Sequence, residues 1–431
     1  MNELCQRLEC GGFDTQFACL YGARKDEQPP RYVRLLDRFE ARFGAREGAA
    51  FFSAPGRTEI GGNHTDHNHG RVLAGAVDLD VIAVAAPWDE PYVCLLSEGH
   101  EENRVELSDL TARERAEEEN PRSNALLRGV LAGFRQSGAP IGGFCACTAS
   151  DILAGSGLSS SAAFEILLCT MLDSLFGRGD MPPLAKAQVS QRAENLFFHK
   201  PCGLMDQTVC AAGNLLLIDF ADPEHPEVTP LGAVQGDGVP GTFLGLHLCV
   251  TAPGGSHAGL TDAYAAVSGE MQAVARALGA RHLRDVDERT LSRRLPALRA
   301  QCGDRSVLRA LHFFAENERV LGQADALKRG ARDEFLRLVR DSGRSSFMYL
   351  QNVYAPEDPA RQALSLALCL SERLLGDRGA WRVHGGGFAG TIQAFVPDEL
   401  LGAYRAELDG VFGKGACRPL SVRSAGGVNL A

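Results

Sequence analysis

Apolar residues follow two periodicities along the first half of the chain, one typical of strands and one typical of helices. Residues 71–87 are rich in β-branched side chains and partly alternate with polar ones, which predicts strand structure. Apolar residues at helical spacing predict four helices in the same half. These helices are expected at residues 124–135, 159–175, 184–198 and 205–212, with further strands at 141–148 and 215–220.

The second half of the chain begins after a segment whose composition indicates a domain boundary. Residues 221–242 are rich in proline, glycine and acidic residues, as connecting segments are. We find no internal repeat and no G-x-x-x-x-G-K-[ST] loop, and helices and strands mix without strict βα alternation. Two α+β domains are therefore expected rather than a doubly wound nucleotide fold. Beyond the boundary, strands are expected at 243–251, 391–396 and 420–423, and helices at 262–278 and 306–328.

Composition excludes several classes of protein. Hydrophobic residues make up 45% of the 431 residues and charged residues 23%, which is usual for a globular enzyme. The 44 basic and 54 acidic residues give a net charge of −10, which argues against general affinity for nucleic acid or an anionic membrane. No window approaches 18 uncharged apolar residues, so no transmembrane helix is expected.

The N-terminal segment and the cysteines indicate a cytoplasmic protein. The first 21 residues carry Glu3 and Glu9 and lack the apolar stretch of a targeting signal. The 13 cysteines are odd in number, lie mostly in apolar runs and form no C-x-x-C pair. We therefore expect free buried thiols in a reducing compartment.

The 48 glycines cluster at residues 56–75, 155–157 and 385–390. The middle cluster belongs to the sequence LAGSGLSSSAA, residues 153–163, in which two glycines precede three serines and an apolar helix. The glycines let the main chain approach a ligand closely, and the N–H groups and dipole of the helix end attract phosphate. The alternative to phosphate binding is that the serines cap the helix, but one serine suffices for capping. The additional hydroxyls favour a phosphate or Mg²⁺ site.

The first glycine cluster begins in the sequence SAPGRTEIGGNHTDHNHG, residues 53–70, which is expected to form a polar, glycine-rich turn. Its Asn, His, Thr and Asp side chains make a donor and acceptor array suited to the vicinal hydroxyls of a sugar. Hydrogen bonding within the turn is a second possibility. A metal cluster is a third, although the spacing matches neither H-E-x-x-H nor a zinc finger. Its ligands would be His64, Asp66, His67 and His69.

Two further segments carry candidate chemistry. Asp206 follows a Pro-Gly turn in residues 200–207, KPCGLMDQ, and fits either an acid favoured by the helix dipole or a carboxylate that accepts a substrate proton. Upstream, Glu194 lies on a predicted helix, where a solvated face is the alternative to a metal ligand. The glycines at 385–387 exceed the needs of a tight turn, which favours close backbone contact with a ligand or another loop.

Together these segments resemble the GHMP kinase superfamily and, within it, the galactokinase family. The galactokinase fingerprint G-R-x-N-[LI]-I-G-E-H-T-D-Y-N-x-G is similar to residues 56–70, and the superfamily loop G-x-G-L-S-S-S-A matches residues 155–162. The galactokinase run P-C-G-[IL]-M-D-Q matches residues 201–207, and G-G-G-F-G-G matches 385–390 except at Ala389. The resemblance runs from about residue 20 to the end of the chain, with the motifs in family order.

The resemblance implies a two-domain α+β GHMP kinase fold with its active site in the cleft between the domains. The first domain is expected at residues 20–222 and the second at residues 243–431. The implied reaction transfers the γ-phosphate of ATP to the C1 hydroxyl of galactose and gives α-D-galactose 1-phosphate and ADP. The expected partners are the sugar, ATP and Mg²⁺, with no nucleic acid or membrane, for a monomer or weak dimer.

The resemblance also assigns roles residue by residue. Asp206 would accept the C1 hydroxyl proton or orient that hydroxyl, and Arg57 would keep Asp206 ionised and stabilise the transition state. Ser161 and Glu194 would hold Mg²⁺. The implied ATP loop is Gly155, Ser156, Gly157, Leu158, Ser159, Ser160 and Ser161, and the implied sugar-binding residues are Asn63, His64, Thr65, Asp66 and Tyr264.

Three of the departures from the family pattern bear on the identity of the substrate. Asn63 stands where the fingerprint has a glutamate expected to hydrogen-bond the sugar 6-hydroxyl. Losing that charge removes repulsion toward a 6-carboxylate, so galacturonate is an alternative substrate. His67 replaces a tyrosine, and His384 replaces the threonine usually found before the glycines.

Two other functions stay open. One is a kinase of the same superfamily that acts on a different small alcohol, which the His64-Thr65-Asp66 run argues against. The other is a sugar-sensing protein without catalysis. The presence of all four implied catalytic and metal-binding residues argues against a sensor.

Overall fold

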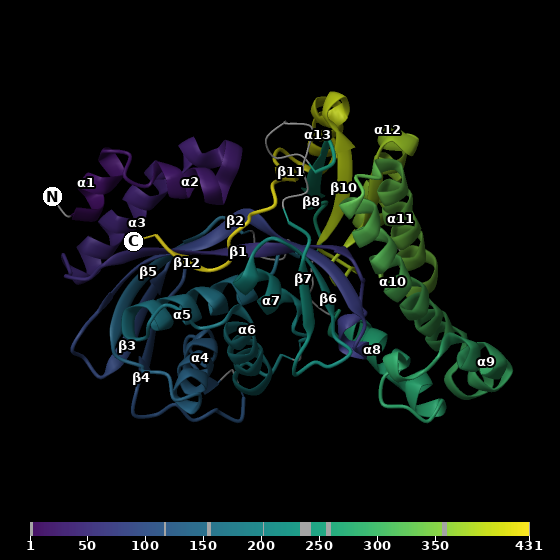
Figure 1. The fold of residues 1–431 in the computed structure, drawn as a ribbon, viewed down its shortest axis with the longest axis horizontal. Coiled ribbons are helices and arrows are strands. Elements are labelled where there is room, and N and C mark those ends of the chain that lie inside the picture. Colours follow the sequence, from purple (N-terminus) through teal and green to yellow (C-terminus); the bar gives the residue numbers. More distant parts are fainter. Residues whose placement is uncertain are drawn as a thin grey trace.

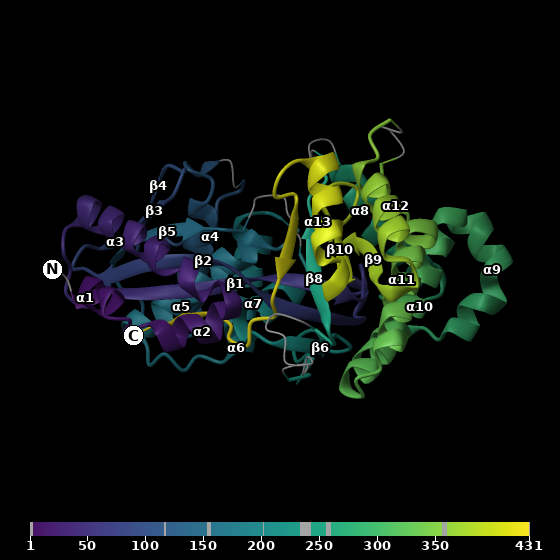
Figure 2. The same cartoon turned by 90° about the horizontal axis from the view of Figure 1, so that it is seen from above.

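The structure is a computed structural model, and its described residues form two sheets flanked by helices (Figures 1 and 2). One sheet has eight strands and the other has four. This is the expected α+β architecture. The structure describes residues 3–115, 118–152, 157–200, 202–232, 243–255, 260–355 and 360–430.

The larger sheet is built around one long strand, β2 (Arg71–Pro87). β1 (Ala50–Gly61) pairs along most of one edge of β2, and β5 (Phe144–Ser150) and β6 (Leu215–Asp219) share the other edge. The pairings in this sheet are antiparallel except that of β3 with β5. The remaining strands are β3 (Tyr92–Ser97), β4 (Glu102–Glu106), β7 (Glu227–Pro230) and β12 (Val428–Asn429).

Helices cover both faces of this sheet (Figure 1), so β2 is buried along nearly its whole length. Alternate residues enter two cores: Val81 packs with α4 to α7, and its neighbour Ile82 packs with α1 to α3. Because both faces are apolar, the sequence of β2 alternates only in part. The helices are α1 (Glu3–Glu9), α2 (Asp14–Tyr21) and α3 (Pro29–Phe43) on one face, and α4 (Asn124–Gln136), α5 (Ser160–Phe176), α6 (Pro183–Arg192) and α7 (Met205–Ala212) on the other.

The smaller sheet has the order β11–β8–β10–β9 and is antiparallel throughout. Ile392 packs on the side of α12 and α13, whereas Phe395 joins the core of the larger sheet together with Phe335 of α11. The strands are β8 (Leu246–Thr251), β9 (Ala380–His384), β10 (Thr391–Pro397) and β11 (Cys417–Leu420). The helices are α8 (Thr261–Ala277), α9 (Glu288–Cys302), α10 (Asp304–Lys328), α11 (Arg332–Ser345), α12 (Ala363–Leu375) and α13 (Asp398–Phe412).

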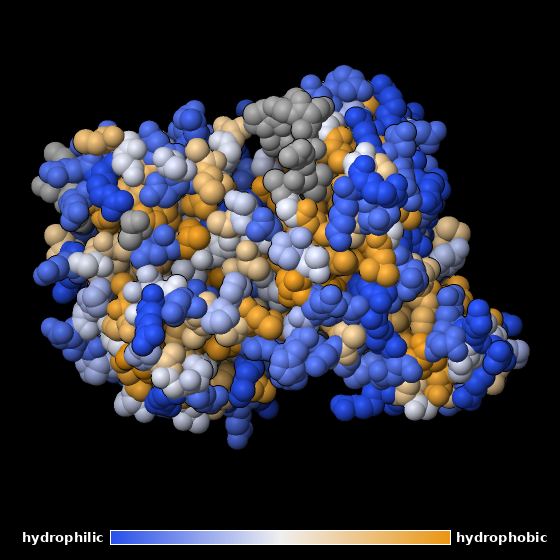
Figure 3. Space-filling view, in the orientation of Figure 1, coloured by the Kyte–Doolittle hydropathy of each residue, from blue (hydrophilic) through white to orange (hydrophobic). Residues whose placement is uncertain are grey.

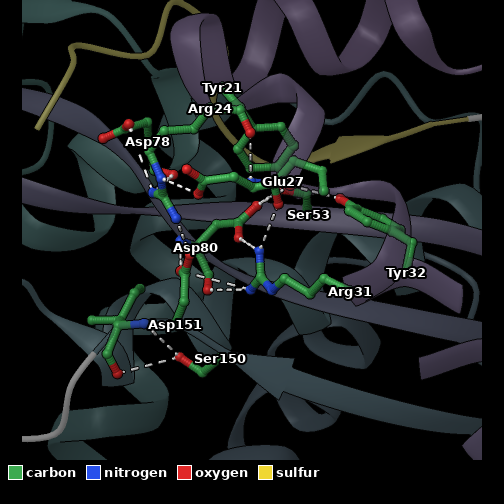
Figure 4. Close-up of polar contacts among 12 residues, drawn as sticks. Tyr21, Arg24, Glu27, Arg31, Tyr32, Ser53, Asp78, Asp80, Ser150 and Asp151 are labelled. Atoms are coloured by element: carbon green, nitrogen blue, oxygen red, sulfur yellow. Dashed lines mark hydrogen bonds and ion pairs between the residues drawn. The ribbon is translucent and has the colours of Figure 1, made fainter. Parts of the chain in front are cut away.

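A buried ionic cluster ties the N-terminal helices to the larger sheet (Figure 4). The fully buried Asp80 carboxylate on β2 accepts hydrogen bonds from Arg31 at 2.5 Å and from Tyr21 at 2.6 Å. The Asp80 N–H donates to the Asp151 carboxylate at 2.7 Å, and Arg24 reaches the same carboxylate at 3.2 Å. The cluster therefore joins α2 and α3 to β2 and to the segment that follows β5.

Residues 53–61 differ from the prediction of a turn, because they form most of β1. The pairing of β1 with β2 shifts register between Pro55 and Arg57 and again between Glu59 and Gly61. Such bulges accommodate proline and glycine in a strand. Only residues 62–70 form the polar turn.

Most other predicted elements are confirmed, with differences near the expected boundary and the chain end. The segment 221–242 contains β7, which pairs with β6, so its first half belongs to the larger sheet. The predicted helix 184–198 ends at Arg192 and continues as a π-helical turn. The predicted strand 420–423 is confirmed only at Leu420, where β11 ends, and at Val422, which forms an isolated β-bridge with Val77.

The end of the chain returns to the larger sheet. β12 pairs with β1, and Leu430 packs into the core of the N-terminal helices. Figures 1 and 2 accordingly place the C-terminus beside those helices. The domain limits 20–222 and 243–431 stay a prediction, and β7 and β12 join the larger sheet from outside the first range.

The thiols and the surface agree with the composition. All 13 cysteines are free, as expected, and seven of them are buried. Figure 3 shows polar residues over much of one face, with apolar residues in scattered groups. In the described part of the chain, no helix is long and apolar enough to cross a membrane.

Candidate active site

Arg57 and Asp206 form the centre of the candidate site. Arg57 comes from β1 and Asp206 from the first turn of α7. The guanidinium binds the carboxylate twice, Nε to Oδ1 at 2.6 Å and Nη2 to Oδ2 at 2.8 Å. Burial lowers the pKa of Arg57, but Asp206 outweighs this and raises the pKa above its ordinary value. The side chain of Asp206 is 31% exposed and that of Arg57 only 8%, so the carboxylate is open to a substrate while its partner is buried.

The described part of the phosphate loop closes onto this pair. Ser159 precedes α5 with a left-handed φ of 58°, and its hydroxyl donates to Asp206 Oδ2. Arg57 also donates to the carbonyl of Gly157. Among the described residues no side chain caps α5, so the capping alternative for the serines is wrong. Gly155 and Ser156 lie outside the described residues.

The backbone conformation at residue 157 and the lack of space around it both favour glycine. Its φ is 70°, and a Cβ there would lie 3.2 Å from both His384 Nδ1 and Thr391 Oγ1. His384 Nε2 accepts a hydrogen bond from the N–H of Glu59 at 3.3 Å, so its proton lies on Nδ1. Burial and then Arg57 lower the pKa of His384 well below its usual value. A neutral His384 thus joins β9 to β1 and to the phosphate loop.

Glu194 and Ser161, the two predicted metal ligands, contact each other. Glu194 comes from the π-helical turn Ala193–Phe197 and is 2% exposed. The Ser161 hydroxyl donates to Glu194 Oε1 at 3.1 Å, and Lys200 Nζ binds the same oxygen at 2.6 Å. Gln207 holds the other oxygen at 2.9 Å. Hydroxyl and carboxylate oxygens beside a helix end that attracts phosphate suit Mg²⁺, so these residues fit the predicted metal site.

The histidine-rich turn does not form a metal centre. Within the described ranges, no three His, Cys, Asp or Glu side chains gather as metal ligands. His69 instead stacks on His282 with ring centroids 3.6 Å apart, and His64 Nε2 donates to the carbonyl of Gly386 at 3.0 Å. The metal-cluster alternative is therefore wrong.

α10 holds the turn at residues 62–70 through buried polar side chains. Glu316 Oε1 accepts a hydrogen bond from the N–H of Gly62 at 3.1 Å. One helical turn earlier, His312 Nε2 donates to the carbonyl of Asn63 at 2.9 Å. Gly62 has a φ of 90°, which glycine adopts most easily, so the chain can turn toward α10 at this point.

Asp66 and its neighbour His64 are predicted sugar-binding residues, and Asp66 lies against the segment that leads to Asp206. A Cβ on Gly203, three residues before Asp206, would overlap Asp66 Oδ2. Burial raises the pKa of Asp66, but hydrogen bonding to His67 outweighs it and keeps the group ionised. Burial and His67 lower the pKa of His64 to about 4, so its ring is neutral. A carboxylate and a neutral imidazole can both bind hydroxyl groups.

Asn63 and Thr65, the other two predicted sugar-binding residues of this turn, make hydrogen bonds within the protein. Both residues are fully buried. The Thr65 hydroxyl lies 2.8 Å from the carbonyl of Gly62 and 2.6 Å from that of Arg71. The Asn63 amide makes four hydrogen bonds within the protein. The polar atoms of these two residues hold the turn, and their contact with the sugar stays a prediction.

The glycine-rich segment after β9 packs against the same turn and against Tyr264. The Tyr264 hydroxyl donates to the carbonyl of Gly387 at 2.7 Å, and burial raises its pKa to about 12. A Cβ on Gly386 would lie 2.6 Å from the Tyr264 ring, and one on Gly387 would overlap the Asn352 carbonyl. The predicted close contact of these glycines with another loop is confirmed.

Sequence reasoning missed two parts of the site. Glu59 lies two residues after Arg57 on β1 and pairs with Arg382 of β9 at 2.6 Å. Strand periodicity could have revealed Glu59, since residues two apart on a strand face the same side. The α10 side chains His312 and Glu316 gave no local signal, because they meet the turn only through the fold.

Comparison with known proteins places these features in a family context. The galactose-binding signature of galactokinases matches residues 37–87, and the N-terminal domain of GHMP kinases matches residues 125–214. Human galactokinase is 34% identical over 358 residues, which cover 82% of this chain and 84% of the human protein. Dog galactokinase is 32% identical over 372 residues, which cover 84% of this chain and 88% of the dog protein.

Solved structures share the fold. Lactococcus lactis galactokinase complexed with galactose superposes with a TM-score of 0.77 at 21% identity, covering 92% of this chain and 99% of that chain. Methanococcus jannaschii mevalonate kinase superposes with a TM-score of 0.61 at 14% identity, covering 88% and 99%. At these identities the likeness concerns the fold alone.

Proposed function

Because this chain belongs to the galactokinase family of the GHMP kinases, we propose that it transfers the γ-phosphate of ATP to the C1 hydroxyl of galactose. The products are α-D-galactose 1-phosphate and ADP. The observation that carries this proposal is the partly exposed Asp206 carboxylate, which accepts two hydrogen bonds from Arg57 near the N-terminal end of α5.

In this proposal Asp206 binds the C1 hydroxyl and accepts its proton as the oxygen attacks the γ-phosphorus. Arg57 keeps the carboxylate ionised and contributes positive charge where negative charge develops in the transition state. Ser159 fixes the Asp206 carboxylate through its hydroxyl. Phosphoryl transfer depends mainly on such positioning and charge stabilisation, so a phosphate-loop lysine is not required.

The phosphates of ATP lie, in this proposal, at the N-terminal end of α5 beside Gly157, where the helix dipole attracts negative charge. Ser161 and Glu194 would hold Mg²⁺, which supplies positive charge for the phosphate oxygens. Lys200 adds a second positive charge, 2.6 Å from Glu194. Leu158 is buried and anchors the loop in the core of the larger sheet.

The sugar lies between Asp206 and the turn at residues 62–70. His64 and Asp66 bind its hydroxyl groups, and Tyr264 positions the glycine-rich segment through the carbonyl of Gly387. Domains at 20–222 and 243–431 would enclose this cleft. We expect the enzyme to be a monomer or weak dimer in the cytoplasm.

A coupled assay of ADP release over hexoses, pentoses, hexosamines and uronic acids tests the proposal. We expect galactose to give the highest kcat/KM, with product phosphorylated at C1 by nuclear magnetic resonance. A preference for galacturonate would establish the alternative substrate. ADP release with none of the sugars would support the sugar-sensing alternative, provided that galactose still binds by calorimetry.

A further inference from the structure

The Asn63 amide has no capacity left for a ligand. Its Nδ2 donates to Glu59 Oε1 at 3.0 Å and to the carbonyl of Gly385 at 2.7 Å. Its Oδ1 accepts from Ser346 at 3.2 Å and from Asn352 at 2.9 Å. A primary amide has two donor hydrogens and two acceptor lone pairs, so these four bonds saturate it. A different group must therefore meet the part of the sugar for which the fingerprint glutamate was expected.

Glu59, unlike Asn63, has an oxygen atom that can accept a hydrogen bond from a ligand. Its side chain is 4% exposed, and Oε1 is held by Arg382 and Asn63. Across the described residues, Oε2 has no hydrogen-bond partner, yet it is not among the fully enclosed unpartnered atoms. A nearly buried carboxylate oxygen without a donor is costly unless a ligand supplies one.

The strand places Glu59 next to the reacting groups. Arg57 and Glu59 pair with Ala76 and Ala74 of β2 in regular register, so both side chains leave the same face of β1 about 7 Å apart. Glu59 therefore lies on the face of β1 from which Arg57 reaches Asp206. Burial raises the pKa of Glu59 to about 7, although the nearby Arg382 and Arg57 act to lower it, so the carboxylate is mostly ionised above neutral pH.

The sequence shows the same exchange. The fingerprint has asparagine at the position of Glu59 and glutamate at the position of Asn63, four residues later. This chain has the two residue types in reverse order and joins them by a hydrogen bond. This chain therefore has the same two residue types as the fingerprint, but its carboxylate lies on β1 rather than in the turn at residues 62–70.

We propose that Glu59, and not Asn63, is the sugar-selecting residue of this enzyme. Its Oε2 accepts a hydrogen bond from a hydroxyl of a neutral hexose, and its charge disfavours a sugar that carries a carboxylate there. This inference rests on the proposed function and narrows its substrate class to neutral hexoses, against galacturonate.

The competing explanation is that Glu59 serves only to hold Arg382 and so to join β1 to β9. The variant E59Q separates the two roles, because glutamine keeps the shape and can still accept from Arg382. E119Q is the matched control: Glu119 is also buried and pairs with an arginine, Arg128 of α4, at 2.6 Å, but its arginine partners, Arg128 and Arg113, are not residues of the proposed site.

The experiment measures kcat/KM for galactose and galacturonate at about pH 8, where Glu59 is mostly ionised, and the unfolding temperature, for the wild type and both variants. We expect E59Q to raise KM for galactose about tenfold or more and to lower the galactose-to-galacturonate ratio of kcat/KM. E119Q should leave the KM for galactose and the galactose-to-galacturonate ratio of kcat/KM unchanged. An E59Q variant that folds, with the wild-type KM and ratio, would overturn the proposal while leaving galactose kinase activity standing.

If E59Q does not fold, a crystal structure of the wild type with galactose decides. Glu59 Oε2 within hydrogen-bond distance of a sugar hydroxyl supports the proposal, and a sugar contacted by the Asn63 amide instead overturns it. A wild type that phosphorylates no sugar would contradict the proposed function itself, which distinguishes the two failures.

Discussion

The side chain of Asn63 illustrates, at the scale of one residue, how a polar group in a binding motif can serve the fold. The N63A variant would remove the Asn63 partner of the Gly385 carbonyl and of the Ser346 hydroxyl, and one of the two hydrogen bonds of Asn352 Nδ2, all in a buried place. Each unpaired group costs about 1–3 kcal/mol, so we expect a marked fall in unfolding temperature. Differential scanning calorimetry measures it, and a wild-type unfolding temperature would contradict the four-bond network.

At the scale of elements, α10 holds the turn at residues 62–70 in place through the Glu316 carboxylate. Burial raises the pKa of Glu316, but Arg319 and other positive groups outweigh it and lower the pKa to about 2. The folded pKa lies below the unfolded value of about 4.3, so this group stabilises the fold above that pH and loses its effect as the pH falls toward 2.

The E316Q variant tests this contribution. We expect its free energy of unfolding to lie about 3 kcal/mol below that of the wild type at neutral pH, with the difference shrinking below about pH 4.3. Urea denaturation at several pH values measures the difference. A gap that is independent of pH would show that the Glu316 charge has no role.

Some helices and strands of the structure could be predicted from the sequence, and others could not. Helices such as α7 and the long strand β2 follow local periodicity, so they could be predicted within a few residues. Residues 53–61 could not, because glycine and proline indicate a turn unless bulges accommodate them. The motif residues Arg57 and Asp206 were identifiable, but the contacts of the turn with α10 depend on residues distant in the chain.

At the scale of the whole molecule, the ionic cluster around Asp80 fixes the N-terminal helices on the larger sheet. We expect R31A to destabilise the protein by about 1.5–3 kcal/mol, because Asp80 loses a charged hydrogen-bond donor and keeps Arg423, at 3.2 Å, as its remaining arginine partner. R42A is the control on the same helix, since its pair with Glu102 is largely exposed and contributes less than about 1 kcal/mol. Chemical denaturation of both variants provides the comparison, and equal losses would contradict a special role for the cluster.

The most direct test of the catalytic assignment is the turnover of D206N with galactose and ATP. Asparagine preserves the shape of the side chain and removes the base, so we predict a folded protein that still binds galactose by calorimetry but has a kcat lower by about 10²-fold or more. A D206N enzyme with wild-type kcat would contradict the account, because the carboxylate held by Arg57 would then have no part in the transfer.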